Sequence, residues 1–463
     1  MTRIDIDTAR RLLLKAAGAG GLGALLASCG GGSTDTEAAP VPLAADDGTQ
    51  TALGTSRTTA TLATTSLKGR VLVVGGGMAG AAVAKYLRLW GGSGVQVTLI
   101  ERATSYTSNI MSNFVLTGQK TVAQLGYKYD TLVSKYGISR VQDEVLAIDP
   151  VARSVTLASG AKLAYDRLVL APGIDFIYDP MDGGIPGLET PSAQAKILHA
   201  WQAGPQSTAL RNQILAMPSG GVFVLTIPAK PYRCPPGPYE RACLVADWLK
   251  KNRPGSKVII LDANPGITAE VHSFTDAFTN VHAGVTEYHA NASIQSIDPA
   301  TMTLHTNLGA IKAHVINAIP PHKAGRIVTA SGLADAGGRW APVNVLSYES
   351  KLAAGVHVIG DAAATAQPKA GHIGNQLGKV CADAIVRAFA GQSPDPAPVT
   401  NSACYSPITM DTASWLTAVF QYDPASGGMA VVQDSFREAE QRSKDHIEEM
   451  NRWFAALMAE TYA

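Results

Sequence analysis

Two of the five cysteines, Cys234 and Cys404, lie in segments suited to sulfur chemistry rather than to core packing. Each stands among proline, tyrosine or serine residues in an expected loop, and Arg233 precedes Cys234, where its charge would stabilise a thiolate. In an oxidising compartment the two would form a disulfide. The sequence leaves two roles open for it: a structural bridge between distant segments, or a redox bridge beside a cofactor.

The elements that would position a cofactor begin at residue 69, with GRVLVVGGGMAGAAVAKYLRLWGGSGVQVTLIE up to residue 101. The apolar runs Val71–Val74 and Val95–Ile100 are typical of buried strands, and helix formers fill Ala81–Leu89. Strand, glycine turn, helix and strand follow one another as in a dinucleotide-binding unit.

The glycine turn carries the pattern G-x-G-x-x-G at Gly75, Gly77 and Gly80. The first glycine makes the tight turn, the second lets a pyrophosphate touch the backbone, and the third lets helix and strand pack closely. The helix N-terminus offers N–H groups to phosphate, and an acid at the end of the second strand, Glu101, is placed to accept hydrogen bonds from ribose. We expect nucleotide contacts at Gly75, Gly77, Met78, Ala79, Gly80, Glu101 and Arg102.

Two later segments favour FAD over NAD. The strand Leu168–Leu170 ends in Ala171-Pro172-Gly173, a turn that recurs in flavoproteins, and the strand Val356–Ala362 contains Gly360-Asp361, whose carboxylate is expected to bind the ribityl or pyrophosphate group. A helix expected over Gly371–Ala390 would point its N-terminus at the flavin ring, where its dipole stabilises a negatively charged reduced flavin. Expected contacts outside the glycine turn are Val145, Ala171, Gly173, Gly360 and Asp361.

A second α/β unit is expected between residues 184 and 324, where strands Val222–Ile227 and Lys257–Asp262 flank a helix at Tyr239–Lys251. In reductases with two dinucleotide sites, a second glycine fingerprint follows the first of these strands. Here the strand is followed by PAKPYRCPPGP, which lacks G-x-G-x-x-G and whose prolines have no N–H to donate. We therefore expect no nicotinamide nucleotide site there.

The chain has 463 residues, of which 46% are hydrophobic, enough for two or three domains. Its formal net charge of +1 gives no support for a nucleic-acid partner. We expect a twin-arginine signal peptide with a lipobox (1–28), a flexible linker (29–67), the FAD-binding domain (68–183), a second Rossmann-type domain (184–324), a return to the FAD-binding domain (325–394) and a C-terminal domain (395–463).

The N-terminus is predicted to direct export to the periplasm. Arg10-Arg11 precedes an apolar run that ends at Ala27 and is too short and glycine-rich for a membrane span. A twin arginine indicates the export route for folded, cofactor-loaded proteins, although an ordinary secretory signal also fits. The segment Leu26–Cys29 resembles the lipobox of bacterial lipoproteins, which predicts a lipid on Cys29 that tethers the protein to a membrane; alternatively, Cys29 leaves with the signal peptide.

For the remaining cysteines and for the C-terminus we expect structural roles. Cys243 and Cys381 lie in apolar helical segments and are expected in the core. Residues 435–459 are expected to form a charged helix carrying Trp453 and Phe454. Such a helix packs on its own protein or lies on a membrane or a partner, and we favour the first.

Together these motifs resemble the flavoprotein subunit of flavocytochrome c sulfide dehydrogenase, a relative of sulfide:quinone oxidoreductases. The resemblance runs from about Gly69 to the C-terminus and rests on the glycine turn, RCPPGPYER at 233–241, Gly360-Asp361 and Cys404-Tyr405-Ser406. The proline-rich stretch is its specific part. The resemblance implies an α/β, glutathione-reductase-like fold with two Rossmann-type domains and a C-terminal interface domain that docks a c-type cytochrome.

The resemblance also implies a mechanism. Cys234 and Cys404 match the redox disulfide next to the flavin, and Glu240 matches an acid near that site that is a candidate proton acceptor. Sulfide would attack one sulfur of the disulfide, and the freed thiolate or the persulfide would pass two electrons to the flavin. The flavin would return them singly to haem.

One loop departs from the family pattern. The family often links FAD covalently through a Cys in the loop that here spans residues 106–113, and the matching position is Asn109. We therefore expect tightly bound, non-covalent FAD. The chain contains no C-x-x-C-H, so the cytochrome, whether a permanent subunit or a soluble cytochrome c, must be a separate molecule.

Other functions stay open at this stage. A quinone acceptor of the sulfide:quinone type would suit a lipid anchor and the C-terminal helix, and another thiol or persulfide would suit the same disulfide and flavin. A flavin-binding electron carrier without a substrate of its own is disfavoured, because it would not need Cys234 and Cys404.

Overall fold

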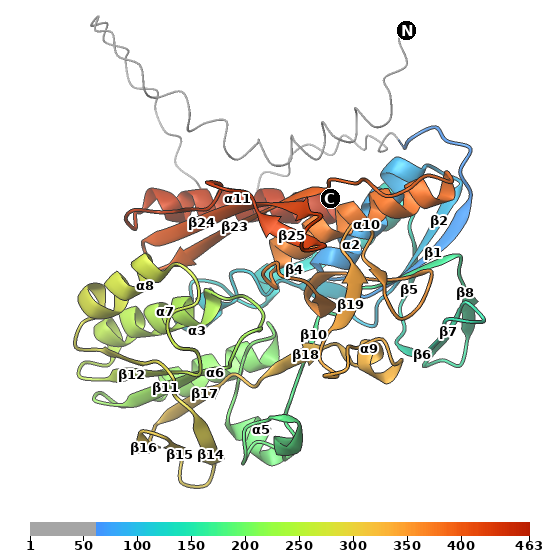
Figure 1. Cartoon of the computed structure of the whole chain (residues 1–463). Helices are drawn as coiled ribbons and strands as arrows, with labels where there is room; N and C mark the ends of the chain where they lie inside the picture. The colour runs from blue at the N-terminus through green and yellow to red at the C-terminus, as the bar shows by residue number, and fades with distance from the viewer. Residues whose placement is uncertain (1–61) are drawn as a thin grey trace, which may run out of the picture. The chain divides into compact units, whose positions relative to one another are not determined.

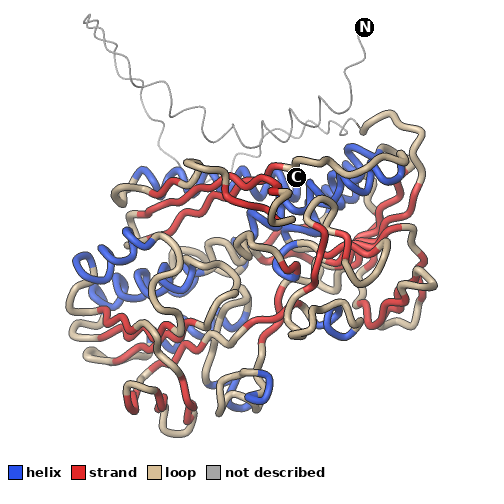
Figure 2. The backbone as a smooth tube through the Cα atoms, viewed as in Figure 1, coloured by secondary structure: helices blue, strands red, loops and turns tan. Residues whose placement is uncertain are grey.

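Two parallel sheets organise residues 62–463, the part of the chain that the computed structural model describes (Figure 1). The predicted signal peptide, the lipobox with Cys29 and the linker up to residue 61 lie outside the described residues. In both units helices cover the strands, as Figure 2 shows. The architecture is the expected α/β class.

The first sheet joins segments that are far apart in the sequence. Five of its strands run parallel in the order β21, β9, β1, β2, β5, with β5 at one edge, and β20, β19 and β22 extend the sheet beyond β21, with β20 antiparallel. The bounds are β1 Gly69–Val74, β2 Val95–Ile100, β5 Ser139–Val141, β9 Arg167–Leu170, β19 Ala341–Asn344, β20 Glu349–Ser350, β21 Val356–Val358 and β22 Ala363–Ala364. The segment after residue 340 therefore returns to the sheet that begins at β1.

Helices α2 (Met78–Gly91) and α10 (Gly371–Phe389) lie side by side against this sheet (Figure 1). Small residues allow the close approach: a Cβ on Gly378 would lie 2.8 Å from the carbonyl oxygen of Ala79. Because both helices begin at the cavity described below, their packing fixes two helix N-termini next to each other. Nearby lie α3 (Asn113–Thr117), α4 (Asp130–Tyr136), the hairpin of β3 (Ser105–Thr107) and β4 (Gly126–Lys128), and the small sheet β6 (Val145–Asp149), β7 (Ser154–Leu157) and β8 (Lys162–Ala164).

The second sheet is parallel, in the order β13, β12, β11, β17. Its strands β11 (Val222–Ile227) and β12 (Lys257–Asp262) have the predicted bounds, followed by β13 (Thr286–His289) and β17 (Val315–Ala318). Helix α7 (Gly237–Asn252) follows β11 and buries one face on it, including Cys243. Three helices and a small sheet lie around the second sheet: α5 (Pro191–Lys196), α6 (Pro205–Leu215), α8 (Val271–Asp276), and β14 (Ile294–Asp298), β15 (Thr303–Thr306) and β16 (Gly309–Lys312). Between the two units, β10 (Ile174–Phe176) pairs with β18 (His322–Ala324). Helix α9 (Arg326–Ala330) follows β18.

The C-terminal region corrects two predictions. Cys404 lies not in a loop but in β23 (Val399–Pro407), which pairs with β24 (Ala413–Asp423) along its whole length. The last helix, α11 (Asp445–Tyr462), begins ten residues later than expected, because β25 (Gly428–Val431) and β26 (Arg437–Glu438) pair with β24 first. Both errors arise because cross-strand pairing with distant residues overrides local composition.

Helix α11 packs on the first unit, as we favoured. Phe454 and Tyr462 are buried, and the Tyr462 ring stacks on Tyr106 with a centroid distance of 5.2 Å. The Tyr462 hydroxyl donates to the carbonyl of Gly76 in the glycine turn at 3.1 Å. None of the helices in the described part of the chain has the length and hydropathy needed to cross a bilayer.

Candidate active site

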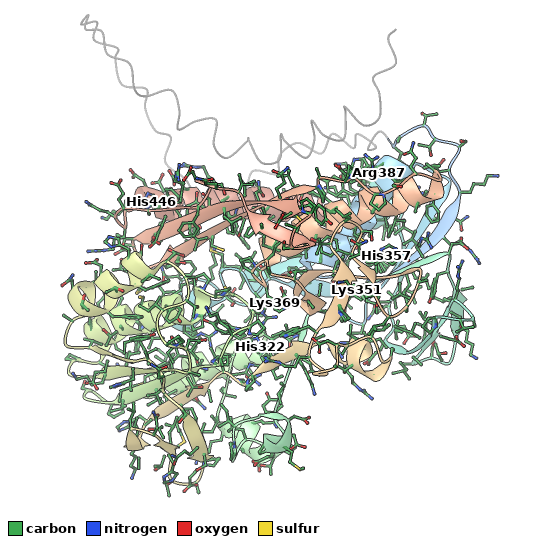
Figure 3. The ribbon with its side chains drawn as sticks, in the orientation of Figure 1. His322, Lys351, His357, Lys369, Arg387 and His446 are labelled. Atoms are coloured by element: carbon green, nitrogen blue, oxygen red, sulfur yellow. The ribbon has the colours of Figure 1, made fainter. Side chains whose placement is uncertain are left out.

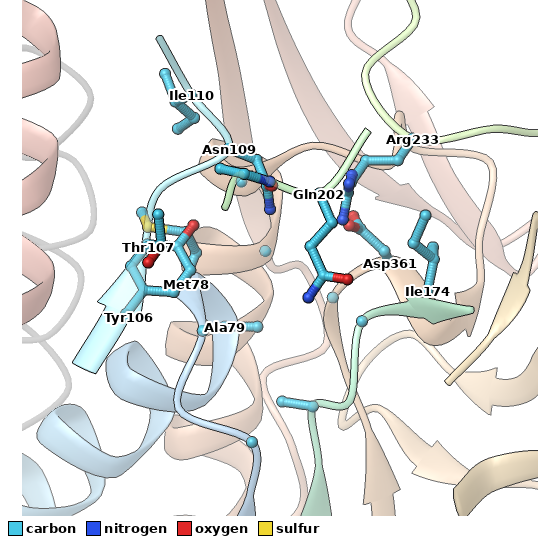
Figure 4. A pocket seen from close by; sticks show the side chains of 18 of the residues that line it. Met78, Ala79, Tyr106, Thr107, Asn109, Ile110, Ile174, Gln202, Arg233 and Asp361 are labelled. Carbon is cyan, nitrogen blue, oxygen red and sulfur yellow. The ribbon is translucent and has the colours of Figure 1, made fainter. Parts of the chain in front are cut away.

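A cavity of about 700 Å³ opens where the two sheets and the C-terminal sheet meet (Figure 4). Residues from every part of the described chain line it, including Met450 and Trp453 of α11. The predicted site residues that line the cavity are Gly75, Gly77, Met78, Ala79, Glu101, Arg102, Asn109, Val145, Ala171, Gly173, Cys234, Glu240, Gly360, Asp361 and Cys404. The fold thus gathers the expected cofactor contacts and the expected redox residues around one space.

Gly80 is the one predicted contact that does not line this cavity. A Cβ on Gly80 would overlap the carbonyl oxygen of Gly75, so this glycine lets α2 approach the turn rather than touching a ligand. Gly77 differs: a Cβ there would meet only the Tyr106 ring, at 3.9 Å, and would project into the cavity. The turn therefore leaves space for a ligand at its second glycine and uses its third for packing.

Glu101 stands at the end of β2 and braces the glycine turn. Its Oε2 accepts from the backbone N–H of Gly76 at 2.8 Å, and its Oε1 accepts from that of Ala103 at 2.8 Å. A carboxylate has about four lone-pair sites, so two backbone bonds leave it able to accept from ribose hydroxyls as well.

Asp361 and Arg233 point toward each other across the cavity (Figure 4). Burial raises the pKa of Asp361, while the charges of Arg233 and Lys369 oppose that rise. Lys369 donates to the carbonyls of Asp361 and Ala363 at 2.8 and 2.9 Å, and Figure 3 places it at the junction of the two units. The half-buried Arg233 and the buried Lys369 thus face the end of β21, where an anionic group would be stabilised.

Cys234 lies in the connection from β11 to α7, where a second nucleotide fingerprint would otherwise stand. Its backbone φ is +61°, and its N–H donates to the Lys369 carbonyl at 2.7 Å, which holds the thiol toward the cavity. A Cβ on Gly237 would lie 2.8 Å from the Cys234 sulfur, so glycine is required there. Burial, then the charge of Glu240, raises the pKa of the Cys234 thiol to about 12, and Arg233 opposes that rise.

Cys404 faces the same cavity from β23. Burial and then the charge of Cys234 raise the pKa of its thiol well above the usual range, which places the two sulfurs within electrostatic reach of each other. The expected disulfide is not formed in this structure: both cysteines are free thiols. Both thiols are half-buried at the cavity, and burial favours their protonated form.

Glu240 reaches the cavity from the first turn of α7. Its Oε1 accepts from the Asn113 amide nitrogen at 2.9 Å. Burial raises the pKa of Glu240 to about 7, against the opposing effects of the Asn113 hydrogen bond and the charge of Arg241. A carboxyl group with such a pKa takes up and releases a proton near neutral pH.

Arg241 fixes the orientation of Asn113. Its Nε donates to the Asn113 Oδ1 at 2.9 Å, so the Asn113 amide nitrogen must face Glu240. The rest of the guanidinium donates to the carbonyls of His199 and Ala200, each at 2.7 Å, and to the Asn317 Oδ1 at 2.9 Å. Each of the three nitrogens of this buried cation donates at least one hydrogen bond, which is the condition under which burial of a charge is tolerated.

The sequence did not reveal this network. Asn113 ends the loop compared with the family's flavin-linking loop, and Arg241 ends the stretch 233–241 that carries the family resemblance. Their contact forms only because α3 packs against α7. Glu270, a buried acid near Cys404, was also missed. The adjacent charges Glu240-Arg241, directly before the apolar run Ala242–Ala246, were the local signal for a charged pair at this site.

Two family models match the chain. Residues 207–320 match the central region of the flavoprotein chain of sulfide dehydrogenase [flavocytochrome c], and residues 69–208 match the pyridine nucleotide-disulphide oxidoreductases. The predicted resemblance and the predicted fold class are confirmed. The second model also supports a flavin cofactor.

Comparison with curated proteins also finds a sulfide-oxidising relative. The sulfide-quinone reductase of Aquifex aeolicus (strain VF5) is 25% identical over 276 residues, 57% of this chain and 60% of that protein. Ferroptosis suppressor protein 1 of Taeniopygia guttata is 33% identical over 109 residues, 23% of this chain and 27% of that protein. The matched segments thus span less than two thirds of these relatives.

The solved structure of the sulfide:quinone oxidoreductase from Aquifex aeolicus has the same fold. It superposes with a TM-score of 0.66 at 18% identity and covers 84% of this chain and 92% of that one. By sequence, the chain is homologous to sulfide-quinone reductases, and its residues 207–320 are similar to the flavoprotein chain of flavocytochrome c sulfide dehydrogenase.

Proposed function

We propose that this relative of the sulfide-oxidising flavoproteins binds FAD non-covalently, oxidises sulfide through Cys234 and Cys404, and passes the electrons to a c-type cytochrome. The observation that carries the proposal is the meeting of both thiols, Glu240 and the glycine turn at one cavity. A cavity with only one of these features would suit a carrier or a plain nucleotide-binding protein.

The residues around the cavity fit a flavin nucleotide. The open space beside Gly77 and the N-terminus of α2 suit a pyrophosphate, and Glu101 suits a ribose. Gly360 and Asp361, with the N-terminus of α10, suit the ribityl chain and the ring. Asn109 supports non-covalent binding, because its Oδ1 accepts from the Ala203 N–H at 2.8 Å and no thiol stands in its loop.

The thiol pair provides the sulfur chemistry in its oxidised form. A hydrosulfide ion attacks one sulfur of the disulfide, the S–S bond breaks, and a persulfide forms on one cysteine while the other becomes a thiolate. A second hydrosulfide removes the outer sulfur as hydrogen disulfide and leaves both cysteines reduced. Bound flavin supplies the two-electron oxidant that returns this pair to the disulfide.

Glu240 receives the proton that Cys234 loses when the disulfide closes again. A thiol whose pKa is raised to about 12 does not ionise alone at neutral pH, so the step needs a base. Glu240 is suited to this because burial raises its own pKa to about 7, so that about half of it is ionised there.

For the acceptor, the match of residues 207–320 to a flavocytochrome c flavoprotein favours a cytochrome. Quinone is the second candidate, because the sulfide-quinone reductase of Aquifex aeolicus matches over 276 residues. We further propose, from the twin arginine and Cys29 alone, that the protein works in the periplasm on a lipid tether.

The central test replaces each cysteine of the pair in the flavin-loaded protein. Cys234→Ser and Cys404→Ser should abolish flavin reduction by sulfide in stopped-flow absorbance, because the sulfur acceptor is gone, whereas dithionite should still reduce the flavin. Cys381→Ala, a buried thiol away from the cavity, is the matched control and should behave as wild type. Reduction of either serine variant by sulfide at the wild-type rate would refute the proposed chemistry.

The acceptor is tested separately. Sulfide-reduced wild-type protein should be reoxidised faster by cytochrome c than by a short-chain quinone at equal concentration. The opposite order would replace the cytochrome with a quinone without touching the sulfur chemistry.

A further inference from the structure

Glu270 is a buried acid that the proposed reaction has not yet used. It is 1% exposed and precedes α8, with a backbone φ of +49°. Its Oε1 accepts from the Ser406 hydroxyl at 2.5 Å, and the Ser414 hydroxyl lies near enough to the carboxyl group to lower its pKa. Its Oε2 accepts no well-aligned hydrogen bond from the described residues. A buried carboxyl group with so few hydrogen bonds is costly, so Glu270 is a candidate for a role beyond packing.

Glu270 lies on the Cys404 side of the C-terminal sheet. Cys404 and Ser406 are two residues apart in β23, so their side chains leave the same face of the strand. Ser406 bonds Glu270 directly, and the charge of Glu270 contributes to the raised pKa of Cys404. Each cysteine of the pair is therefore influenced by its own carboxyl group, the half-buried Glu240 for Cys234 and the buried Glu270 for Cys404.

Hydroxyl groups lead from Glu270 toward the surface. Ser414 stands opposite Ser406 on β24 and is 0% exposed. Its hydroxyl lies 2.7 Å from that of Ser273, which donates to the Glu438 Oε1 at 3.1 Å. Ser273 and Glu438 are half-buried, so exposure increases along this series.

We propose that Glu270 accepts the proton of Cys404 when the disulfide forms and that Ser414, Ser273 and Glu438 pass this proton to solvent. The inference rests on the proposed function. In the step, two S–H bonds break and one S–S bond forms between Cys234 and Cys404. Two electrons go to the bound flavin, one proton goes to Glu240, and the other goes to Glu270.

The reaction requires such an exit. A one-electron acceptor such as haem takes electrons without protons, so every turnover leaves protons that must reach solvent. Glu240 is bonded to Asn113 inside the network of buried Arg241, whereas Glu270 is followed by hydroxyl groups that donate and accept. The two carboxyl groups are therefore not equivalent: Glu240 exchanges a proton at the cavity that it lines, and Glu270 lies behind Cys404 on the way to the surface.

Burial raises the pKa of Glu270 to about 8, which supports this role. Ser406 and Ser414 oppose the rise, and the charges of Glu438 and Glu240 add to it. The titratable groups that face Glu270 are Glu438 from β26, Glu240 and Cys243 from α7, and Cys404 from β23.

The test follows disulfide formation in flavin-loaded protein with reduced cysteines, mixed with ferricyanide and quenched by alkylation. Glu270→Gln keeps an oxygen for Ser406 but cannot take a proton, so it should slow disulfide formation by about 10²-fold, the lower range for loss of a general base. Ser414→Ala should slow it less and abolish the solvent deuterium isotope effect. Ser435→Ala is the matched control and should stay at the wild-type rate, because the Ser435 hydroxyl bonds the backbone of Val419 in β24 and no member of the proposed route.

The outcomes separate this inference from the proposed function, because ferricyanide replaces the natural acceptor and no sulfide is used. If sulfide fails to reduce the flavin of the wild-type protein, the proposed sulfide oxidation is refuted, but the ferricyanide assay of disulfide formation remains valid. Wild-type rates and pH dependence in both Glu270→Gln and Ser414→Ala refute the exit route. If Glu270→Gln does not fold, Ser414→Ala alone decides, since it removes one hydroxyl and keeps the carboxyl group.

Discussion

Replacement of Asn113 by leucine is a sharp test of how the fold sets the proton affinity of Glu240. The change keeps the size of the side chain and removes the amide that donates to the Glu240 Oε1 at 2.9 Å. This hydrogen bond stabilises the ionised carboxylate, and it lowers the pKa of Glu240 against the larger, opposite effect of burial. Without it, Glu240 should hold its proton at higher pH.

The magnitude follows from the strength of such a bond. A hydrogen bond to a charged group is worth about 1.5–3 kcal/mol, and about 1.4 kcal/mol corresponds to one pH unit. The rate of sulfide-driven flavin reduction should therefore rise with an inflection near pH 7 in the wild type and about 1 to 2 pH units higher in Asn113→Leu. At pH 7 the ionised fraction, and with it the rate, should fall by roughly 5- to 50-fold.

Stopped-flow measurements of flavin reduction between about pH 5.5 and pH 10 cover both expected inflections and so measure this shift. The matched control is Asn317→Leu, because Asn317 also accepts from Arg241, at 2.9 Å, but does not bond Glu240. Asn113→Leu should regain the wild-type rate in alkaline buffer, which a misfolded variant would not do. An unmoved inflection, or an equal shift in Asn317→Leu, would refute the assigned role of the amide.

Four further outcomes are expected. Gly80→Ala should lower the melting temperature even without flavin, because its Cβ would overlap a backbone carbonyl, whereas Gly77→Ala should weaken flavin binding in a fluorescence titration and leave apo-protein stability unchanged. Burial raises the pKa of Glu270 in the folded state above its unfolded value, so the folded protein loses stability as pH rises from the unfolded pKa to about 8. Glu270→Gln removes this loss, so the melting temperature of the variant relative to the wild type should rise across that pH window and then level off. Acid precipitation should release the flavin into the supernatant, and flavin in the pellet would mean that a residue other than Asn109 links it. Cys29→Ala should leave export intact and move the protein from the membrane fraction to the soluble periplasm; unchanged fractionation would exclude the lipid tether.

Local sequence patterns predicted the elements around the nucleotide turn and in the second sheet. The strands β11 and β12 have the expected bounds, because short apolar runs bounded by turn residues specify buried strands without help from distant parts. The spacing of Gly75, Gly77 and Gly80 predicted a turn whose third glycine serves packing, which the overlap between a Gly80 Cβ and the Gly75 carbonyl explains.

The C-terminal region shows where local patterns fail. Residues 399–407 are polar enough to resemble a loop, yet they form β23 because each residue pairs with one of β24. A strand that owes its existence to its partner carries little local signal. The placement of Cys404 on a strand, two residues from Ser406, therefore came only from the structure, and with it the position of Glu270 relative to the thiol pair.

The sequence by itself determined which chemistry the chain carries: the glycine turn, the Gly360-Asp361 end of a strand, and two cysteines outside apolar helices. Tertiary structure alone decided how protons are handled around that chemistry. Glu240, Asn113 and Arg241 become a network only when α3 packs against α7, and Glu270 meets Ser406 only when β23 lies over the start of α8. The physical reason is that a pKa depends on burial and on neighbours from other segments, and neither can be deduced from the order of residues along one segment.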